Sequence, residues 1–396
     1  MDFNLHIDRT RSNSYKWDNR AAVFGTEDVL PMWVADMDFQ APPAVIRAVR
    51  ERVEHGVFGY TYPSPSYYES IINWMQNRHN WKIEKEWIQF CPGVVPALSL
   101  IVEMFTEPED QVMIQTPVYP PFHSVVKNHG RELVCSPLLE QDGYYSMDFE
   151  DMESKMADGK VKLLILCSPH NPVGRVWTKQ ELQQLADLCA KWNVLVVSDE
   201  IHADLVFEAG SHTPFASLSE GAAQRSIICT APSKTFNIAG LHTANLVIPN
   251  KELRAKFSKA LEIHAMGSAT PLGLAAAEAA YREGAEWLDA LLDHVRGNMD
   301  YVCDFCEGHL PEVKVWRPEG TYLLWLDFRA LGLKGKELSS FLIEEAKLGL
   351  NSGDSFGTDG DGFMRMNLGC TRATVEEAMR RLEAAVSKRL HSIDEK

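Results

Sequence analysis

The segment VLVVSDEIHADL, residues 194–205, indicates the fold of this 396-residue chain. Its first half is an almost wholly apolar run of strand length, which is typical of a strand covered on both faces. A similar run precedes it at residues 162–167. Between the two, Thr178 and Glu181 have the spacing of a capping box, which predicts a helix to about Trp192. Strand, helix and strand in this order predict a parallel α/β sheet.

The same alternation extends outward in both directions. We expect strands at residues 88–91, 112–115, 132–135, 162–167, 194–198, 226–230 and 245–248. After residue 250 helical periodicity dominates to about Gly308, with a break at residues 270–271. Strand candidates at 313–316, 321–327 and 363–367, with helices near 336–347 and 374–390, predict a smaller α+β unit. We therefore expect an N-terminal arm with part of the small domain (1–45), a large domain (46–283) and a small C-terminal domain (284–396).

Composition and charge narrow the classes of function. The chain has 55 acidic and 39 basic residues, and a formal net charge of -16. Such a surface repels phosphodiester backbones and anionic membranes, so we expect neither nucleic acid nor membrane as a partner. The apolar runs are too short to span a bilayer, and residues 1–18 lack an apolar signal core, which favours a cytoplasmic location. Cys303 and Cys306 lie inside a predicted helix without a second ligand pair, so no metal site is expected.

Five of the predicted strands are followed by residues that could bind a ligand. Ligands of open α/β sheets bind outside the carboxyl ends of the strands, so these residues are candidate site residues. They are Gly93, Val94 and Val95 at a turn that opens a helix, Tyr119 between prolines, Asn171 before Pro172, Asp199 followed by Glu200 and His202, and Ser233 with Lys234.

Each of these features alone also fits an ordinary turn, a packed tyrosine or a solvated lysine. Together they supply an anion cradle at a helix N-terminus, a stacking ring and a hydrogen-bond donor for a ring oxygen. Asp199 supplies an anion for a ring nitrogen, and Lys234 supplies an amine for a Schiff base. Pyridoxal 5′-phosphate needs this set of groups, so the sequence predicts that cofactor.

Several strings then carry a resemblance that runs from about Pro31 to Arg372. They are PMWVADMDF (31–39), FGYTYPS (58–64), CPGVVPALS (91–99), TPVYPPF (116–122), SPHNPVGRVW (168–177), SDEIHADL (198–205), APSKTFNIAGLHTAN (231–245) and FMRMNLGC (363–370). The chain resembles the aminotransferase class I/II family, the fold-type I pyridoxal-phosphate enzymes. Within that family it is most similar to the branch of carbon–sulfur lyases of the MalY/PatB cystathionine β-lyase type.

The resemblance implies roles for individual residues. Lys234 would carry the cofactor and move protons at the substrate Cα, and Asp199 would bind the pyridinium nitrogen. Asn171 would bind the 3′ oxygen, and Tyr119 would stack on the ring. Backbone N–H groups around Val94 and Val95, helped by Ser233, would hold the phosphate. Tyr60 would reach the site of the partner subunit in a homodimer, and Arg365 would bind the substrate carboxylate as a bidentate fork.

Two positions depart from the pattern of many aminotransferases. Where a tyrosine is common near the 3′ oxygen, this chain has His202, as the similar β-lyases do. Where an arginine and a serine are common near the phosphate, it has His242 and Ala231. Loss of an arginine–phosphate pair removes a bond worth about 1.5–3 kcal/mol, so the phosphate is held more weakly or by other groups.

The expected activity is elimination of a thiol from cystathionine or another S-substituted cysteine, which leaves ammonia and pyruvate. An aminotransferase that uses a 2-oxo acid is the alternative, and a non-enzymatic binding protein is a third interpretation. The string GDSFG at 353–357 matches a serine-hydrolase motif, but more glycines and aspartates follow up to Gly362, so we expect a mobile loop there.

Overall fold

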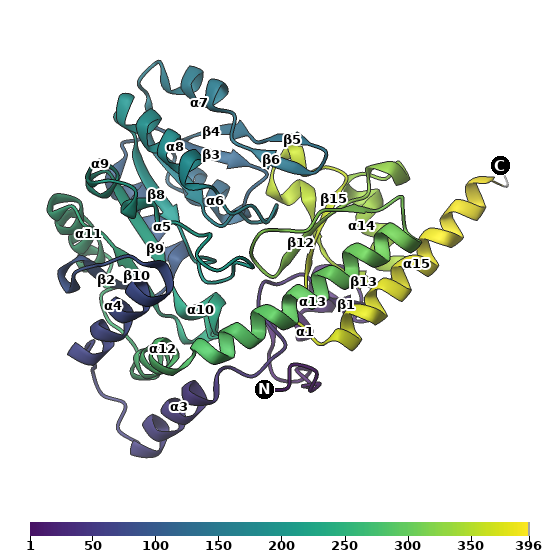
Figure 1. Cartoon of the computed structure of the whole chain (residues 1–396), viewed down its shortest axis with the longest axis horizontal. Helices are drawn as coiled ribbons and strands as arrows, with labels where there is room; N and C mark the ends of the chain where they lie inside the picture. The colour runs from purple at the N-terminus through teal and green to yellow at the C-terminus, as the bar shows by residue number, and fades with distance from the viewer. Residues whose placement is uncertain (395–396) are drawn as a thin grey trace.

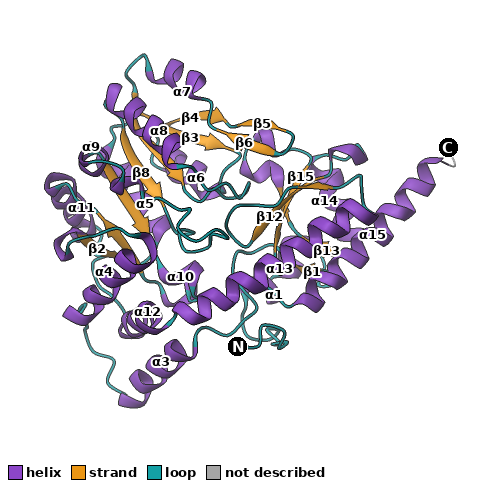
Figure 2. Ribbon diagram, viewed as in Figure 1, coloured by secondary structure: helices purple, strands orange, loops and turns teal. Residues whose placement is uncertain are grey.

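The computed structural model describes residues 1–394, and its largest feature is a seven-stranded sheet (Figures 1 and 2). The strands lie in the order β2 (Ile88–Cys91), β10 (Ala244–Val247), β9 (Ser226–Thr230), β8 (Leu195–Asp199), β7 (Val161–Cys167), β3 (Gln111–Thr116) and β4 (Glu132–Pro137). All neighbours in this order run parallel except the two pairs that include β10. The predicted mostly parallel α/β sheet is confirmed, and each of the seven predicted runs forms a strand.

Helices cover both faces of this sheet (Figure 2). One face packs against α5 (Val94–Phe105), α6 (Pro120–Asn128) and α11 (Lys251–Ile263). The other packs against α4 (Pro65–His79), α7 (Phe149–Met156), α8 (Lys179–Lys191), α9 (Glu220–Gln224) and α12 (Pro271–Glu283). The central strands are therefore buried on two sides, which is why their sequences are nearly all apolar. The capping box of Thr178 and Glu181 is present at the start of α8.

A second sheet contains residues from the C-terminal part of the chain. It is antiparallel, in the order β11 (Lys314–Val315), β12 (Leu323–Asp327), β15 (Phe363–Asn367) and β14 (Asn351–Ser352). The helices α13 (Ala285–His309), α14 (Gly335–Glu344) and α15 (Arg372–Asp394) lie in the same half of the molecule (Figure 1). In that half, β1 (Leu30–Pro31) pairs in parallel with β13 (Leu348–Gly349). The domain boundaries near residues 45 and 283 stay a prediction.

Several further helices and one hairpin connect these parts of the chain. They are α1 (Tyr15–Asp18), α2 (Arg20–Phe24), α3 (Pro43–His55), α10 (Pro232–Thr235), the hairpin β5 (Leu139–Gln141) with β6 (Tyr144–Ser146), and the 3-10 helices η1 (Lys85–Trp87), η2 (Phe215–Ser217), η3 (Ala239–Leu241) and η4 (Arg329–Leu331).

The segment after β14 differs from the expected irregular loop. It forms the 3-10 helices η5 (Gly353–Phe356) and η6 (Thr358–Gly360), which pack so closely that a Cβ on Gly353 would lie 2.1 Å from the Gly360 carbonyl oxygen. The Ser355 hydroxyl donates to the Ser352 carbonyl oxygen at 2.6 Å, and no α-helix follows it directly. This serine is not arranged as a hydrolase nucleophile.

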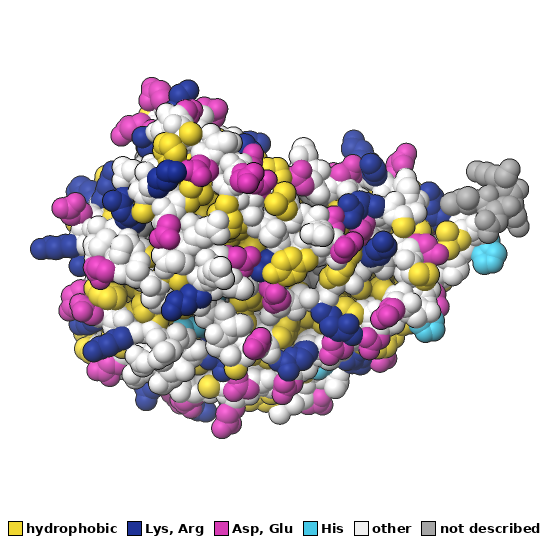
Figure 3. Space-filling view, turned by 45° about the horizontal axis from the view of Figure 1, so that its top comes forward, with side chains coloured by type: hydrophobic (Ala, Val, Ile, Leu, Met, Phe, Trp, Pro, Cys, Tyr) yellow, Lys and Arg dark blue, Asp and Glu magenta, His cyan; other side chains and the backbone are white. Residues whose placement is uncertain are grey.

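The surface carries both signs of charge. Acidic and basic side chains are interspersed over the face shown in Figure 3. In residues 1–394, the helices are all too short or too polar to cross a bilayer.

Candidate active site

A cavity of about 370 Å³ lies where the carboxyl ends of β2, β7, β8 and β9 meet. Nine residues that the sequence predicts to bind cofactor line it together: Gly93, Val94, Val95, Tyr119, Asn171, Asp199, His202, Ser233 and Lys234. Ala231 and His242, the two departures from the common pattern, line it as well. The carboxyl ends of the strands therefore bring residues from distant parts of the chain to one place, as predicted.

Lys234 lies in α10, directly after β9. Its Nζ donates a hydrogen bond to the Ala35 carbonyl oxygen at 2.6 Å. Burial and the positive charge of Arg365 together lower the pKa of Lys234 to about 8, against the opposing effect of Asp36 and Asp199. An amine with a pKa near neutrality is partly unprotonated at working pH, so it can act as a nucleophile or base.

Asp199 is the last residue of β8, a central strand of the sheet, and is 4% exposed. Its Oδ1 accepts a hydrogen bond from the Ile201 backbone N–H at 3.1 Å. Burial raises the pKa of Asp199 to about 7, and the charge of Glu200 adds to this, while Lys234 opposes it. A carboxylate in this position gains stability from a cation placed in the cavity.

The N-terminus of α5 forms another wall of the cavity. Gly93 is the N-cap and no side chain caps the helix, so the backbone N–H groups of Val94 and Val95 are available to an anion. Ser233 and Thr243 add hydroxyl groups to the same cavity, and His242 adds an imidazole. This combination suits a phosphate group, and no arginine lines the cavity.

Three further side chains surround the space between these ends. The Tyr119 backbone N–H donates to the Asn171 carbonyl oxygen at 3.1 Å, which fixes the two loops relative to each other. His202 is 4% exposed, and its Nδ1 has no hydrogen-bond partner among residues 1–394. Burial lowers the pKa of His202 to about 3, so the ring is neutral and one nitrogen is free to bond a ligand.

Arg365 reaches toward this cavity from β15 of the second sheet. Its guanidinium donates to Asn171 Oδ1 at 3.0 Å, to the Trp33 carbonyl oxygen at 2.9 Å and to Asn351 Oδ1 at 2.7 Å. It is 4% exposed, its Nε has no partner, and no carboxylate within residues 1–394 pairs with it in an ion pair. Burial lowers the pKa of Arg365 to about 10. A buried cation whose hydrogen bonds go only to neutral oxygens is suited to binding an anionic group of a ligand.

Tyr60 is not brought to the cavity by its own chain. It lies between α3 and α4 and is fully exposed. Val57, Phe58 and Tyr62 beside it are also exposed.

Comparison with known proteins identifies the family to which this chain belongs. The family model for aminotransferase class I and II matches residues 27–382. The chain belongs to this family. Cystathionine β-lyase PatB of Bacillus subtilis is 48% identical over 387 residues, which cover 98% of this chain and 100% of PatB.

Solved structures of family members agree with the fold. Cystalysin of Treponema denticola, which contains pyridoxal 5′-phosphate, superposes with a TM-score of 0.95 at 41% identity, over 98% of this chain and 99% of cystalysin. The pyridoxal-phosphate-bound C–S lyase of Staphylococcus hominis superposes with a TM-score of 0.91 at 32% identity, over 97% of this chain and 98% of that chain.

Sequence reasoning missed several residues of this aminotransferase-family site. Ala35 lines the cavity and acts through its carbonyl oxygen, and Tyr322 donates to the same oxygen at 2.8 Å. Trp33 and Asn351 hold the Arg365 guanidinium. Trp33 and Ala35 lie within the string PMWVADMDF, which carries part of the family resemblance and was the one sequence signal for these two residues. Any residue type has a backbone carbonyl oxygen, so the sequence does not show which one accepts a hydrogen bond.

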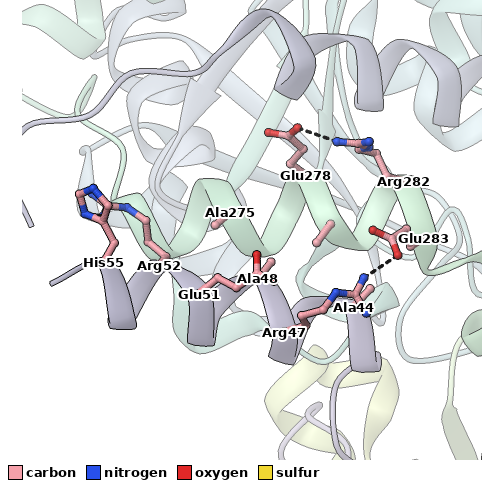
Figure 4. Close-up of a pocket in the computed structure, with 11 residues that line it drawn as sticks. Ala44, Arg47, Ala48, Glu51, Arg52, His55, Ala275, Glu278, Arg282 and Glu283 are labelled. Atoms are coloured by element: carbon pink, nitrogen blue, oxygen red, sulfur yellow. Dashed lines mark hydrogen bonds and ion pairs between the residues drawn. The ribbon is translucent and has the colours of Figure 1, made fainter. Parts of the chain in front are cut away.

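A second hollow of about 600 Å³ lies between α3 and α12 (Figure 4). Two ion pairs lie in it, Arg47 with Glu283 at 2.6 Å and Arg282 with Glu278 at 3.3 Å. It shares no lining residue with the cavity at the strand ends. For residues 1–394, no group of three His, Cys, Asp or Glu side chains is arranged to hold a metal ion.

Proposed function

We propose that this protein is a pyridoxal-5′-phosphate-dependent carbon–sulfur β-lyase. It cleaves cystathionine or a related S-substituted cysteine into a thiol, ammonia and pyruvate. The observation that carries the proposal is one cavity that holds a half-buried amine, Lys234, and a buried carboxylate, Asp199, at the ends of adjacent strands. The 48% identity to a cystathionine β-lyase over nearly the whole chain supports the same reaction.

The residues present fit the cofactor. Its phosphate matches the uncapped N-terminus of α5, and its pyridinium nitrogen matches Asp199, which is buried and has no ion pair with any residue from 1 to 394. The unpartnered Nδ1 of His202 is available to a polar group of the ring. Tyr119 and Asn171 would contact the ring face and the 3′ oxygen.

Lys234 would attach the cofactor covalently and then move the Cα proton of the substrate. When bound, pyridoxal phosphate withdraws electrons from the substrate Cα. The lowered pKa of Lys234 keeps a fraction of the amine unprotonated near pH 7, as a general base requires. Asp199 would keep the ring nitrogen protonated, because an anion beside it favours the charged form.

Arg365 would bind the substrate α-carboxylate. Its hydrogen bonds to Asn171, Trp33 and Asn351 hold the planar guanidinium in one orientation. The Nε–H and one N–H of Nη1 remain for a carboxylate, so the fixed guanidinium can orient the substrate as well as bind it.

The chemistry of the leaving group permits elimination, and the likeness to a cystathionine β-lyase favours it over transamination. A thiol has a pKa of about 8.5, so a thiolate leaves Cβ near neutral pH with little help from an acid. The site therefore needs no additional acid to release it. The imidazole of His202 is neutral in the free site, which fits a reaction that needs no strong donor at that position.

A homodimer would complete the site. The exposed side chains of Val57, Phe58, Tyr60 and Tyr62 form a stretch that a single chain leaves in solvent. Large apolar side chains in an exposed stretch are typical of an interface. We propose that Tyr60 enters the partner's cavity.

All eight cysteines are unpaired thiols, which supports a cytoplasmic location.

The test is a pyruvate assay on purified protein with cystathionine and without any 2-oxo acid. We expect pyruvate and a new thiol in equal amounts. A reaction that starts only after a 2-oxo acid is added would identify an aminotransferase instead. Yellow protein that turns over neither cystathionine nor other S-substituted cysteines would point to a binding protein.

A further inference from the structure

One backbone oxygen beside the cavity accepts two hydrogen bonds. The Ala35 carbonyl oxygen is bound by Lys234 Nζ at 2.6 Å and by the Tyr322 hydroxyl at 2.8 Å. A carbonyl oxygen has two lone pairs, so both donors can bind it at once. The Tyr322 hydroxyl and the Lys234 amine are therefore neighbours across a single atom.

The peptide groups on either side of Ala35 are held independently. The Asn367 amide donates to the Val34 and Asp36 carbonyl oxygens at 2.5 and 2.6 Å. The Ala35 carbonyl group lies between these two hydrogen-bonded carbonyl groups. Besides Lys234, the Tyr322 hydroxyl donates to it. The acceptor position for the lysine is thus set by the fold and not by the lysine itself.

Tyr322 is built rigidly into its position. It is 1% exposed, and its ring meets the His202 ring edge to face at a centroid distance of 6.1 Å. Burial raises the pKa of Tyr322 above its ordinary value, so the hydroxyl keeps its proton and acts as a donor.

The residue before it adopts a costly backbone conformation. Thr321 has φ +70°, in the left-handed region that a β-branched residue rarely enters. The Thr321 backbone N–H donates to the Leu205 carbonyl oxygen at 2.7 Å, and Gly320 forms a β-bridge with Val206. Leu205 ends the SDEIHADL segment that carries Asp199 and His202. Strain of this kind persists where surrounding structure enforces it, and it occurs frequently at functional sites.

We propose that Tyr322 is a positioning residue for Lys234, an inference that rests on the proposed function. Whenever the lysine amine is free of the cofactor, it donates to the Ala35 carbonyl oxygen, and the Tyr322 hydroxyl holds that oxygen in place. The amine then stays directed into the cavity between successive proton transfers. The role requires the hydroxyl alone, since the ring serves packing against His202.

The experiment compares Tyr322→Phe with Tyr67→Phe. Tyr67 is also 1% exposed and donates one hydrogen bond, to Asn245 Oδ1 at 2.7 Å, but Asn245 does not line the cavity, whereas Ala35, the acceptor for Tyr322, does. The first measurement removes the cofactor from the full-length protein, adds pyridoxal phosphate back and follows the absorbance of the lysine-bound cofactor. The second is the isotope effect on kcat/KM for cystathionine deuterated at Cα.

For Tyr322→Phe we expect the absorbance to return about fivefold more slowly, which corresponds to one lost hydrogen bond. The isotope effect should rise, because removal of the Cα proton by a less well-placed amine becomes more rate-limiting. Tyr67→Phe should leave both measurements within about 1.5-fold of the parent protein, since its bond lies outside the site.

Parent-like values for Tyr322→Phe in both measurements would overturn the proposal, and so would equal effects in the two variants. Failure of the proposed function is visible separately, because the unaltered protein would then form no lysine-bound cofactor. The melting temperature of each variant reports a folding defect, and a loss of absorbance that merely follows melting would also count against a positioning role.

Discussion

Replacing Asp199 by asparagine should stabilise the cofactor-free protein at high pH and not at low pH. Burial raises the pKa of this carboxyl from 3.8 to about 7 in the folded protein. Between these two pH values the folded protein keeps the Asp199 proton, while the unfolded chain has lost it. The unfolded state binds fewer protons there, so the free energy of unfolding falls as pH rises through this window.

The magnitude follows from the width of the window. Each pH unit changes the free energy of unfolding by about 1.4 kcal/mol, and the change ends near the folded pKa. From about pH 5.5 to about pH 8 the wild-type protein should therefore lose about 2 kcal/mol that the asparagine variant keeps. Asparagine has the same shape and does not titrate, so the difference between the two proteins isolates the carboxyl group.

The assay is urea unfolding of both cofactor-free proteins at these two pH values, followed by tryptophan fluorescence. Asp151→Asn is a matched control, because hydrogen bonds from Lys155 and Ser136 outweigh desolvation and lower the pKa of Asp151. Its effect should be the same at both pH values. With pyridoxal phosphate bound, Asp199→Asn should instead be the less stable protein, since the pyridinium loses its anion. A pH-independent difference between Asp199→Asn and the parent would refute the reasoning.

Three further predictions concern the reaction. Lys234→Ala should abolish both the absorbance of the lysine-bound cofactor and pyruvate formation, with a fall in rate of at least about 10²-fold, and parent-like turnover would show that another residue carries the chemistry. Arg365→Gln should lower kcat/KM for cystathionine by about 10- to 100-fold through loss of charge-assisted bonds, without changing the cofactor absorbance, and an unchanged kcat/KM would place the carboxylate elsewhere. Mixing inactive Lys234→Ala subunits with inactive Tyr60→Ala subunits should restore up to about a quarter of parental activity, because a mixed dimer contains one site with both residues. No recovery after verified subunit exchange would contradict a contribution of Tyr60 in trans.

The sequence predicted the large sheet well because its central strands are buried along their length. β7 and β8 have one or two exposed or half-buried positions at most, so apolar residues fill them and mark their ends. Those ends place Asn171 and Asp199, and adjacent strands bring both to one cavity. The hairpin β5–β6, which lies outside this sheet, was missed. The strand β5 is exposed at every position, so its sequence carries no pattern of alternation.

The missed site residues share a different cause. Ala35 acts through its carbonyl oxygen, which every residue type possesses. The position of Tyr322 depends on the unusual backbone conformation of Thr321. That conformation is held by a hydrogen bond to Leu205, which lies more than one hundred positions away in the sequence. Asn351 meets Arg365 across two antiparallel strands of which one, β14, is only two residues long. Contacts of this kind arise from tertiary structure and are not encoded in local residue patterns.

The reversed direction of β10 lets one stretch of chain line the cavity at two points. β9 ends at Thr230, the chain passes through Lys234, and it comes back to the same edge at His242 and Thr243 before β10 starts. Lys234 and these two residues are thus joined by a connection of fixed length. Inserting or deleting a residue in this connection would change the spacing between Lys234 and His242, and would therefore change which ligand fits the cavity.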